Sequence, residues 1–214
     1  MNVSDEFERF LKEQNSNKRL LLHSCCAPCS SYCLVYTAQY IPVTVFYYNP
    51  NISIDEEYML RANEQMRLID AYNEAGKTKY KIDYVIMPQE KEEFFIRTKG
   101  YETCPERGER CTICFDIRLR KTAEYAKNNG FDYFATTLTL SPLKNAQLIN
   151  KIGMEIANEV GAEYVPTDFK KKEGYKQSIE LSREYNLYRQ DYCGCIYSKE
   201  ERRKAKEAKE RENT

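Results

Sequence analysis

Hydrophobic residues along the chain form short runs, separated by segments long enough for helices. The runs that predict strands are residues 18–23, 43–48, 81–87, 132–138 and 164–165. A turn at 24–29 leads into the first predicted helix. The other segments that predict helices are 54–72, 94–96, 111–128 and 143–160. Glycines 76, 130 and 161 follow three of these segments, as expected at helix ends.

Regular alternation of strands and helices predicts an α/β protein with a mostly parallel sheet flanked by helices. Since we find no linker and no internal repeat, we expect a single domain over residues 1–214, with a helical C-terminal extension at about 170–214. Ligands of such sheets bind beyond the carboxyl ends of the strands. The loops 24–29, 49–53 and 137–145 are therefore expected to share one site.

Composition narrows the class of protein. A content of 42% hydrophobic and 13% aromatic residues excludes a disordered chain. There is no apolar run of the roughly 18 residues that a membrane span needs, and the charged segment 1–14 lacks the apolar core of a signal peptide. We therefore expect a cytoplasmic protein with no membrane partner. Because 33 basic and 33 acidic residues balance, any polyanion must bind through a local patch.

Nine cysteines are the unusual feature of this composition. An odd number without an export signal argues against a disulfide framework, so metal or redox chemistry is the leading interpretation. Cys25 and Cys26 lie between a strand and a helix, where free backbone amides favour the thiolate. Cys111 and Cys114 form a C-x-x-C at the start of a helix, whereas Cys33 is expected to face the core.

Four of these thiols, Cys25, Cys26, Cys111 and Cys114, are predicted to hold either a tetrahedral zinc ion or a four-iron four-sulfur (4Fe-4S) cluster. Adjacent side chains are expected to point apart. This favours the cluster, whose iron corners are separated, over one small ion.

The sequence Cys193-Gly194-Cys195 is a third cysteine pair. A disulfide across a single glycine closes a small strained ring, and strained disulfides are redox-active. Gly194 permits the backbone that this ring needs. As a dithiol, the pair stores the two electrons that a one-electron cluster does not deliver at once. Additional metal ligation and inert thiols are the alternatives.

Five motifs occur in an order that resembles the cobalamin-independent epoxyqueuosine reductase family of the QueH type. They are His23-Ser24-Cys25-Cys26-Ala27-Pro28-Cys29, Tyr48-Asn49-Pro50-Asn51-Ile52, Arg110-Cys111-x-x-Cys114, Thr136-Thr137-Leu138 followed by Ser141-Pro142-x-Lys144-Asn145, and Asp191-Tyr192-Cys193-Gly194-Cys195-x-Tyr197-Ser198. The resemblance extends from about residue 18 to residue 200.

This resemblance implies the last step of queuosine biosynthesis, in which epoxyqueuosine at the wobble position of a tRNA anticodon is reduced to queuosine. It implies a fold similar to the adenine-nucleotide α-hydrolase (PP-loop or HUP) group, although residues 23–29 lack a glycine-rich phosphate cradle. It also implies a 4Fe-4S cluster on Cys25, Cys26, Cys111 and Cys114, a further iron with Cys29 as a ligand, and no cobalamin. The same resemblance implies that Cys193 and Cys195 are a redox-active pair.

Removing the epoxide oxygen as water requires two electrons and two protons, hence an electron-donor partner and a proton donor. As a hypothesis, an open iron site polarises the epoxide oxygen. The candidate proton donors are His23, Asp191, Tyr192 and Tyr197. The candidate tRNA contacts are Lys144, Asn145, Arg107, Arg110, Lys170, Lys171 and Lys172.

Two other classes of protein share part of this pattern. A non-catalytic tRNA-binding protein stabilised by zinc would use the same four thiols as a closed structural site, and it would be colourless. A cytoplasmic thiol-disulfide oxidoreductase would use one of the cysteine pairs, but a thioredoxin-like protein carries its C-x-x-C after the first strand of a smaller fold.

Overall fold

Four of the predicted strands pair side by side in a parallel sheet. The computed structural model describes residues 2–212. The strands are β1 (Leu20–Ser24), β2 (Val43–Tyr47), β3 (Asp83–Ile86) and β4 (Tyr133–Thr136). They are arranged in the order β3-β2-β1-β4. The predicted α/β class is confirmed, and this order is that of the first four strands of Rossmann-like sheets, consistent with the HUP-type resemblance.

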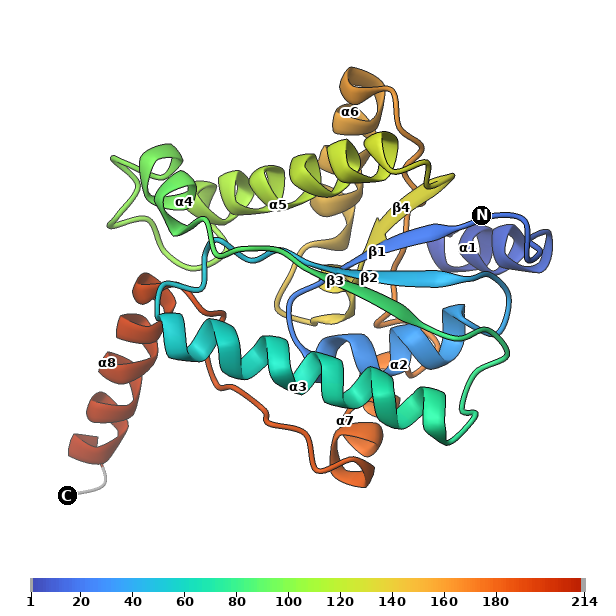
Figure 1. The fold of residues 1–214 in the computed structure, drawn as a ribbon. Coiled ribbons are helices and arrows are strands. Elements are labelled where there is room, and N and C mark those ends of the chain that lie inside the picture. Colours follow the sequence, from blue (N-terminus) through green and yellow to red (C-terminus); the bar gives the residue numbers. More distant parts are fainter. Residues whose placement is uncertain (1, 213–214) are drawn as a thin grey trace.

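Helices cover both faces of the sheet (Figure 1). They are α1 (Val3–Lys12), α2 (Ala27–Thr37), α3 (Asp55–Glu74), α4 (Lys91–Arg97), α5 (Glu109–Asn128), the 3-10 helix η1 (Thr137–Leu140), α6 (Ala146–Val160), α7 (Gly174–Glu184) and α8 (Ile196–Glu212). Helices α4, α5 and α6 lie on one face, and α2, α3 and α7 lie on the other. No helix within residues 2–212 is long and apolar enough to cross a membrane.

Side chains on each strand alternate between two hydrophobic cores. Leu20 and Leu22 of β1 pack with residues of α2, of α3 and of the loops on either side of α7. Leu21 packs with residues of α5 and α6. This division follows from the two-residue period of a strand. Because β1 is buried along its whole length, it is the central element from which the first cysteine loop leaves.

Two elements differ from the predicted pattern. Helix α1 was not predicted, and it is held by Phe7 and Leu11, which are buried against the α2 side. The last predicted strand, at 164–165, is reduced to one bridge between Phe134 and Tyr164. Pro166 follows directly, and because proline has no backbone N–H it does not continue a ladder.

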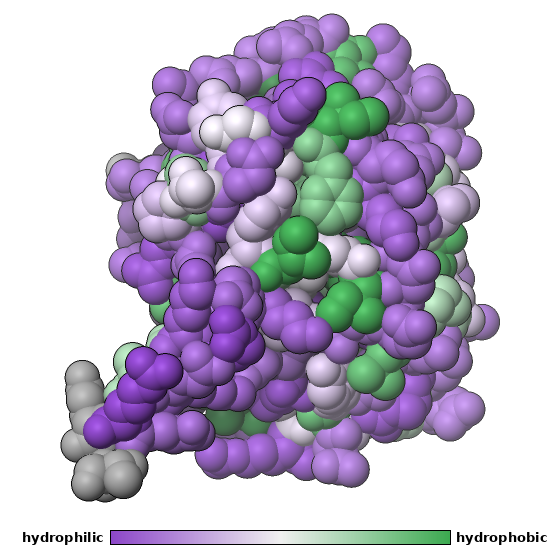
Figure 2. All heavy atoms as spheres, turned by 90° about the vertical axis from the view of Figure 1, so that its left-hand side faces the viewer, coloured by the Kyte–Doolittle hydropathy of each residue, from purple (hydrophilic) through white to green (hydrophobic). Residues whose placement is uncertain are grey.

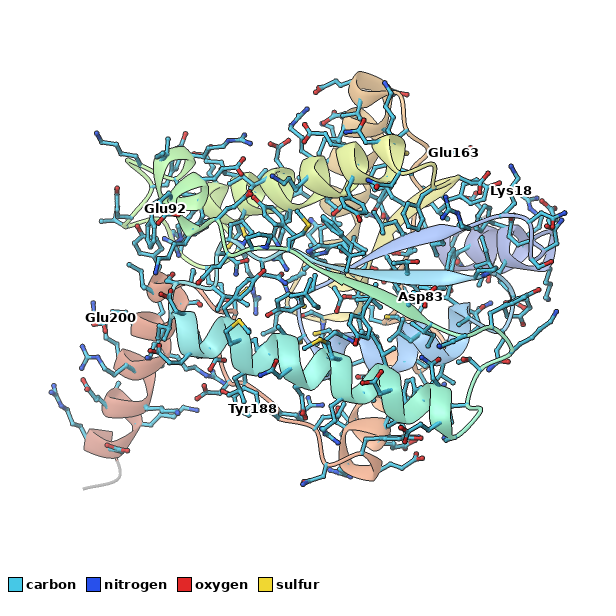
Figure 3. The ribbon with its side chains drawn as sticks, viewed as in Figure 1. Lys18, Asp83, Glu92, Glu163, Tyr188 and Glu200 are labelled. Atoms are coloured by element: carbon cyan, nitrogen blue, oxygen red, sulfur yellow. The ribbon has the colours of Figure 1, made fainter. Side chains whose placement is uncertain are left out.

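Strand order fixes the place where a ligand binds. The chain leaves β1 toward one side of the sheet and β4 lies on the other, so the crevice between their carboxyl ends is the switch point where ligands bind in such folds. Figure 2 looks onto this end of the molecule and shows several hydrophobic side chains in the middle of a largely hydrophilic face. In Figure 3, Glu92 and Glu200 mark this end, and Lys18 and Asp83 lie toward the opposite end.

Candidate metal and redox site

Three cysteines lie together where β1 leads into α2. The Sγ atoms of Cys25, Cys26 and Cys29 all lie within 4.8 Å of one another. Among the residues that the structure describes, this is the one such group of three or more potential metal ligands. Cys26 is the N-cap of α2 with an extended backbone, and Pro28 follows in the first turn, where its missing N–H leaves no bond unmade.

The expectation that Cys25 and Cys26 point apart is wrong. Their Sγ atoms are 3.7 Å apart, because the chain bends from strand to helix at Cys26 and brings both sulfurs to the same side. Zinc with bonds of about 2.3 Å to two thiolates places the sulfurs about 3.8 Å apart in a tetrahedral site. Spacing alone therefore does not favour a cluster over a single ion at these two residues.

The other cysteines approach the same region from α5 and from the segment before α8. Cys111, Cys114, Cys193 and Cys195 line a cavity of about 280 Å³. An adjoining cavity of about 380 Å³ is lined by Cys25, Cys29 and again Cys193. Each of the three predicted cysteine groups thus has members that line at least one of the two adjoining cavities. Cys193 lines both cavities, whereas Cys26 lines neither. Cys33, as expected, is buried in the core, where its thiol donates to the Cys29 carbonyl at 3.2 Å.

The thiols differ in how readily they ionise. Hydrogen bonds from the Cys26 and Cys29 thiols hold the pKa of Cys25 well below its ordinary value. Burial raises the pKa of Cys111 to about 11 and that of Cys114 to about 12. Because metals bind thiolates, occupation of the site by a metal ion must release the protons of these two groups.

A buried arginine that sequence reasoning missed lies among these thiols. Arg118 of α5 is 1% exposed. Its guanidinium donates to Asn49 Oδ1 at 2.7 Å, to His23 Nε2 at 3.4 Å and to Cys114 Sγ at 3.9 Å. None of these partners is a carboxylate. Burial disfavours the charge of Arg118, whereas the Cys114 and Cys25 sulfurs favour it and keep its pKa above the ordinary value.

The Cys193-Gly194-Cys195 segment has the backbone that its glycine was predicted to allow. Gly194 has a φ of +125°, and a Cβ there would lie 2.8 Å from Ile52 Cγ1. Both cysteines are free thiols. Buried Arg61 of α3, also missed from the sequence, donates to the Cys193 carbonyl at 3.1 Å. The segment is therefore held in place by its backbone.

The structure does not support His23 or Asp191 as proton donors. His23 is fully buried and lines neither cavity, and its Nδ1 lies 2.9 Å from Thr136 Oγ1. Burial, followed by the nearby Arg118 charge, lowers the pKa of His23 to about 3, so the ring is neutral at physiological pH. Asp191 lines the larger cavity, but a hydrogen bond from Lys206 at 2.6 Å lowers the pKa of its carboxyl and keeps it ionised.

The two candidate tyrosines both contact arginines. Tyr192 lines the larger cavity, and its ring centroid lies 5.2 Å from the Arg61 guanidinium carbon. The ring of Tyr197 lies 4.5 Å from the corresponding carbon of Arg110. Partial burial raises the pKa of both hydroxyls. Of the two tyrosines, Tyr192 is thus the candidate proton donor that the structure places at a cavity.

Several predicted tRNA contacts have partners inside the protein. Arg110 is 1% exposed and donates to the carbonyls of residues 101 and 102 at 3.1 Å, so its prediction as a phosphate contact is wrong. Lys172 pairs with Asp5 and Glu8 of α1. Lys170 pairs with Asp168 at 3.2 Å.

The remaining predicted tRNA contacts differ from one another. The Asn145 side chain caps α6 by accepting from Leu148 N at 3.1 Å. Lys171 and Arg107 are exposed, and Arg107 lines the smaller cavity. Lys144 is half-buried and lines both cavities.

Fold and site together define an α/β protein with a cluster of cysteines that could hold a metal ion at the switch point of a parallel sheet. The family model for epoxyqueuosine reductase QueH matches residues 20–201. The chain belongs to this family.

Curated relatives agree with this assignment. The chain is 44% identical to epoxyqueuosine reductase QueH of Staphylococcus epidermidis over 182 residues, which are 84% of this chain and 76% of that protein. It is 40% identical to the QueH of Streptococcus pyogenes serotype M1 over 92% of this chain and 76% of the relative. The QueH of Thermotoga maritima is 33% identical over 86% of this chain and 92% of its own length.

Proposed function

We propose that this chain reduces epoxyqueuosine to queuosine in tRNA, with a 4Fe-4S cluster held by Cys25, Cys26, Cys111 and Cys114. Family membership supports the reaction. The observation that supports the proposed cofactor is the environment of Arg118. This buried cation has hydrogen-bond partners that include a thiol and no carboxylate. A buried charge of this kind needs an opposite charge beside it. An anionic thiolate centre supplies that charge.

The thiols outside the cluster have separate roles in this proposal. Oxidation of the Cys193 and Cys195 dithiol to a disulfide releases two electrons and two protons, which convert the epoxide into an alkene and one water. When bound, the cluster supplies single electrons, and Cys29 is placed to ligate a further iron beside it. Cobalamin is not needed for this scheme. A separate electron donor restores the dithiol, and reduced thiols together with a tRNA substrate imply a cytoplasmic enzyme.

Zinc is the alternative occupant, because the 4.8 Å grouping of Cys25, Cys26 and Cys29 also fits one tetrahedral ion. Anaerobic purification followed by iron, sulfide and zinc analysis separates the two proposals. We expect a brown protein with about four sulfide and four to five iron per chain, the fifth being the further iron at Cys29. Cys114→Ala is expected to lose the iron, whereas Cys33→Ala, which removes a core thiol, is expected to keep it. A colourless protein with one zinc per chain would contradict the reductase proposal.

Arginines at the cavity rims are the proposed tRNA contacts. Arg107 precedes α5 and Arg202 lies on α8, and each lines one cavity with an exposed guanidinium. Neither side chain forms a hydrogen bond or ion pair with the residues that the structure describes. We expect Arg107→Ala and Arg202→Ala each to weaken tRNA binding and to reduce the salt slope of log K by about one. Filter binding at several salt concentrations measures both quantities.

Lys172→Ala provides the matched control, because this lysine is already paired with two acidic residues of α1. It is expected to leave the slope unchanged. An unchanged slope in both arginine variants as well would remove the rim from the proposed tRNA interface.

A further inference from the structure

Lys144 occupies the switch point of the sheet. It follows β4 and η1, whereas Cys25 follows β1, so the two residues enter the crevice from its opposite sides. Lys144 lines both cavities, a position that it shares with Cys193. Lys144 is half-buried, and its side chain lies where the two cavities adjoin.

The backbone holds Lys144 in a fixed turn. The Lys144 N–H donates to the Ser141 carbonyl at 3.2 Å, and the Leu143 N–H donates to Ser141 Oγ at 3.3 Å. The next residue, Asn145, is the N-cap of α6. The direction in which the lysine leaves the chain is therefore set before any ligand binds, which is the preorganisation that catalytic electrostatics requires.

Several sulfur atoms and the carboxylate of Glu106 line the cavities beside Lys144. Cys193, Cys25 and Cys29 line the larger cavity together with Lys144. Burial opposes the charge of Lys144, but the electrostatic effect of these sulfurs raises its pKa above the ordinary value. Within residues 2–212 the ammonium group forms no hydrogen bond or ion pair with another side chain. By contrast, Lys170 and Lys172 are paired with carboxylates. Lys144 therefore offers an unoccupied N–H donor in the cavities that the reducing thiols also line.

We propose that Lys144 is a catalytic residue that donates a hydrogen bond to the epoxide oxygen of the substrate and stabilises the negative charge that develops there. This inference rests on the proposed function. The C–O bonds of the epoxide break, and the electrons and protons of the Cys193 and Cys195 dithiol leave an alkene, a disulfide and water. Lys144 is not consumed, because it stabilises the oxygen while the thiols supply both protons.

The alternative role for Lys144 is a contact with an RNA phosphate, as its position before a helix suggested. The two roles differ in what they change. A phosphate contact contributes to the affinity for any tRNA and to its salt dependence. A donor to the reacting oxygen contributes chiefly to the rate at saturating substrate, because the charge that it stabilises develops only during the reaction.

Lys144→Met removes the charge and keeps the length of the side chain. We expect the single-turnover rate at saturating tRNA to fall by about 10²-fold, while iron and sulfide content, tRNA Kd and salt slope remain those of the wild type. Lys144→Arg, which retains a cationic N–H donor, is expected to recover part of the rate. Lys151→Met, which removes an exposed charge from α6, serves as the control and is expected to react at the wild-type rate.

Three results would overturn this assignment: a wild-type rate in Lys144→Met, a weaker Kd with a salt slope reduced by one at an unchanged rate, or loss of iron from the variant. The second would make Lys144 a phosphate contact, and the third a structural counter-charge. Failure of the proposed function itself is distinguishable, because the wild-type protein would then lack iron or would not convert epoxyqueuosine in tRNA.

Discussion

Replacing Cys193 or Cys195 by serine is expected to stop sustained turnover while the iron and sulfide content stays at the wild-type level. Cys193 lines both cavities, and Cys195 is buried at the start of α8, where its Sγ accepts from Ser198 N at 3.4 Å. Without the dithiol, no two-electron store lies beside the substrate. Because neither variant can form the disulfide that supplies both electrons, each should form far less than one product per enzyme even with excess electron donor. Quantifying queuosine in digested tRNA over time measures this limit.

Cys33→Ala is the matched control for the serine variants, since Cys33 lies in the core on α2 and lines neither cavity. Wild-type rates in Cys193→Ser or Cys195→Ser, with the cluster intact, would eliminate the redox pair. Loss of iron from either variant would show that these thiols are metal ligands instead, which was the alternative interpretation of the sequence.

Arg118→Met is expected to weaken retention of the metal centre by roughly 10²- to 10⁴-fold. The substitution removes a buried cation that hydrogen-bonds Cys114, and breaking a buried charge pair costs about 3 to 5 kcal/mol. It also leaves Asn49 Oδ1 without its donor at 2.7 Å. The measurement is the rate at which a chelator removes iron from the anaerobic protein, together with circular dichroism of the metal-free variant to check the fold.

Arg120→Met is the control on the same helix. Arg120 is partly exposed and pairs with Glu159 and Asp116 on the surface, where ion pairs contribute little. Its iron should leave at the wild-type rate. An Arg118→Met protein that is folded and keeps its iron as firmly as the wild type would show that Arg118 is not the counter-charge of a thiolate centre.

Local patterns were sufficient for most of the fold. The predicted strand at 43–48 corresponds to β2 at Val43–Tyr47, and the predicted helix at 54–72 corresponds to α3 at Asp55–Glu74. These elements have regular apolar spacing and clear ends. Helix α1 had a signal too, because Phe7, Phe10 and Leu11 have helical spacing, but its many charges concealed it. The strand expected at 164–165 is reduced to one bridge, because Pro166 has no N–H to continue the ladder.

Site residues were predictable where chemistry is carried by rare residue types. Cysteine spacing and strand-end loops identified all three thiol groups. Arg118 and Arg61 were missed because arginine is usually exposed, and only tertiary packing shows that both are buried. One local signal existed, since Cys114 and Arg118 are four residues apart on α5 and so share a face. The wrong prediction for Arg110 has the same origin, because the adjacent residues in the sequence do not indicate whether a charged side chain is buried.

The three thiol groups become available at different times during synthesis. Cys25, Cys26 and Cys29 belong to one β1–α2 unit, whereas the cavities also require Cys193 and Cys195. At about 5 to 20 residues per second, roughly 10 to 30 s separate translation of residue 29 from that of residue 195. A nascent chain therefore presents three closely spaced thiols before their partners exist. The two adjoining cavities that Cys193 and Cys195 help to line are therefore complete only after that interval.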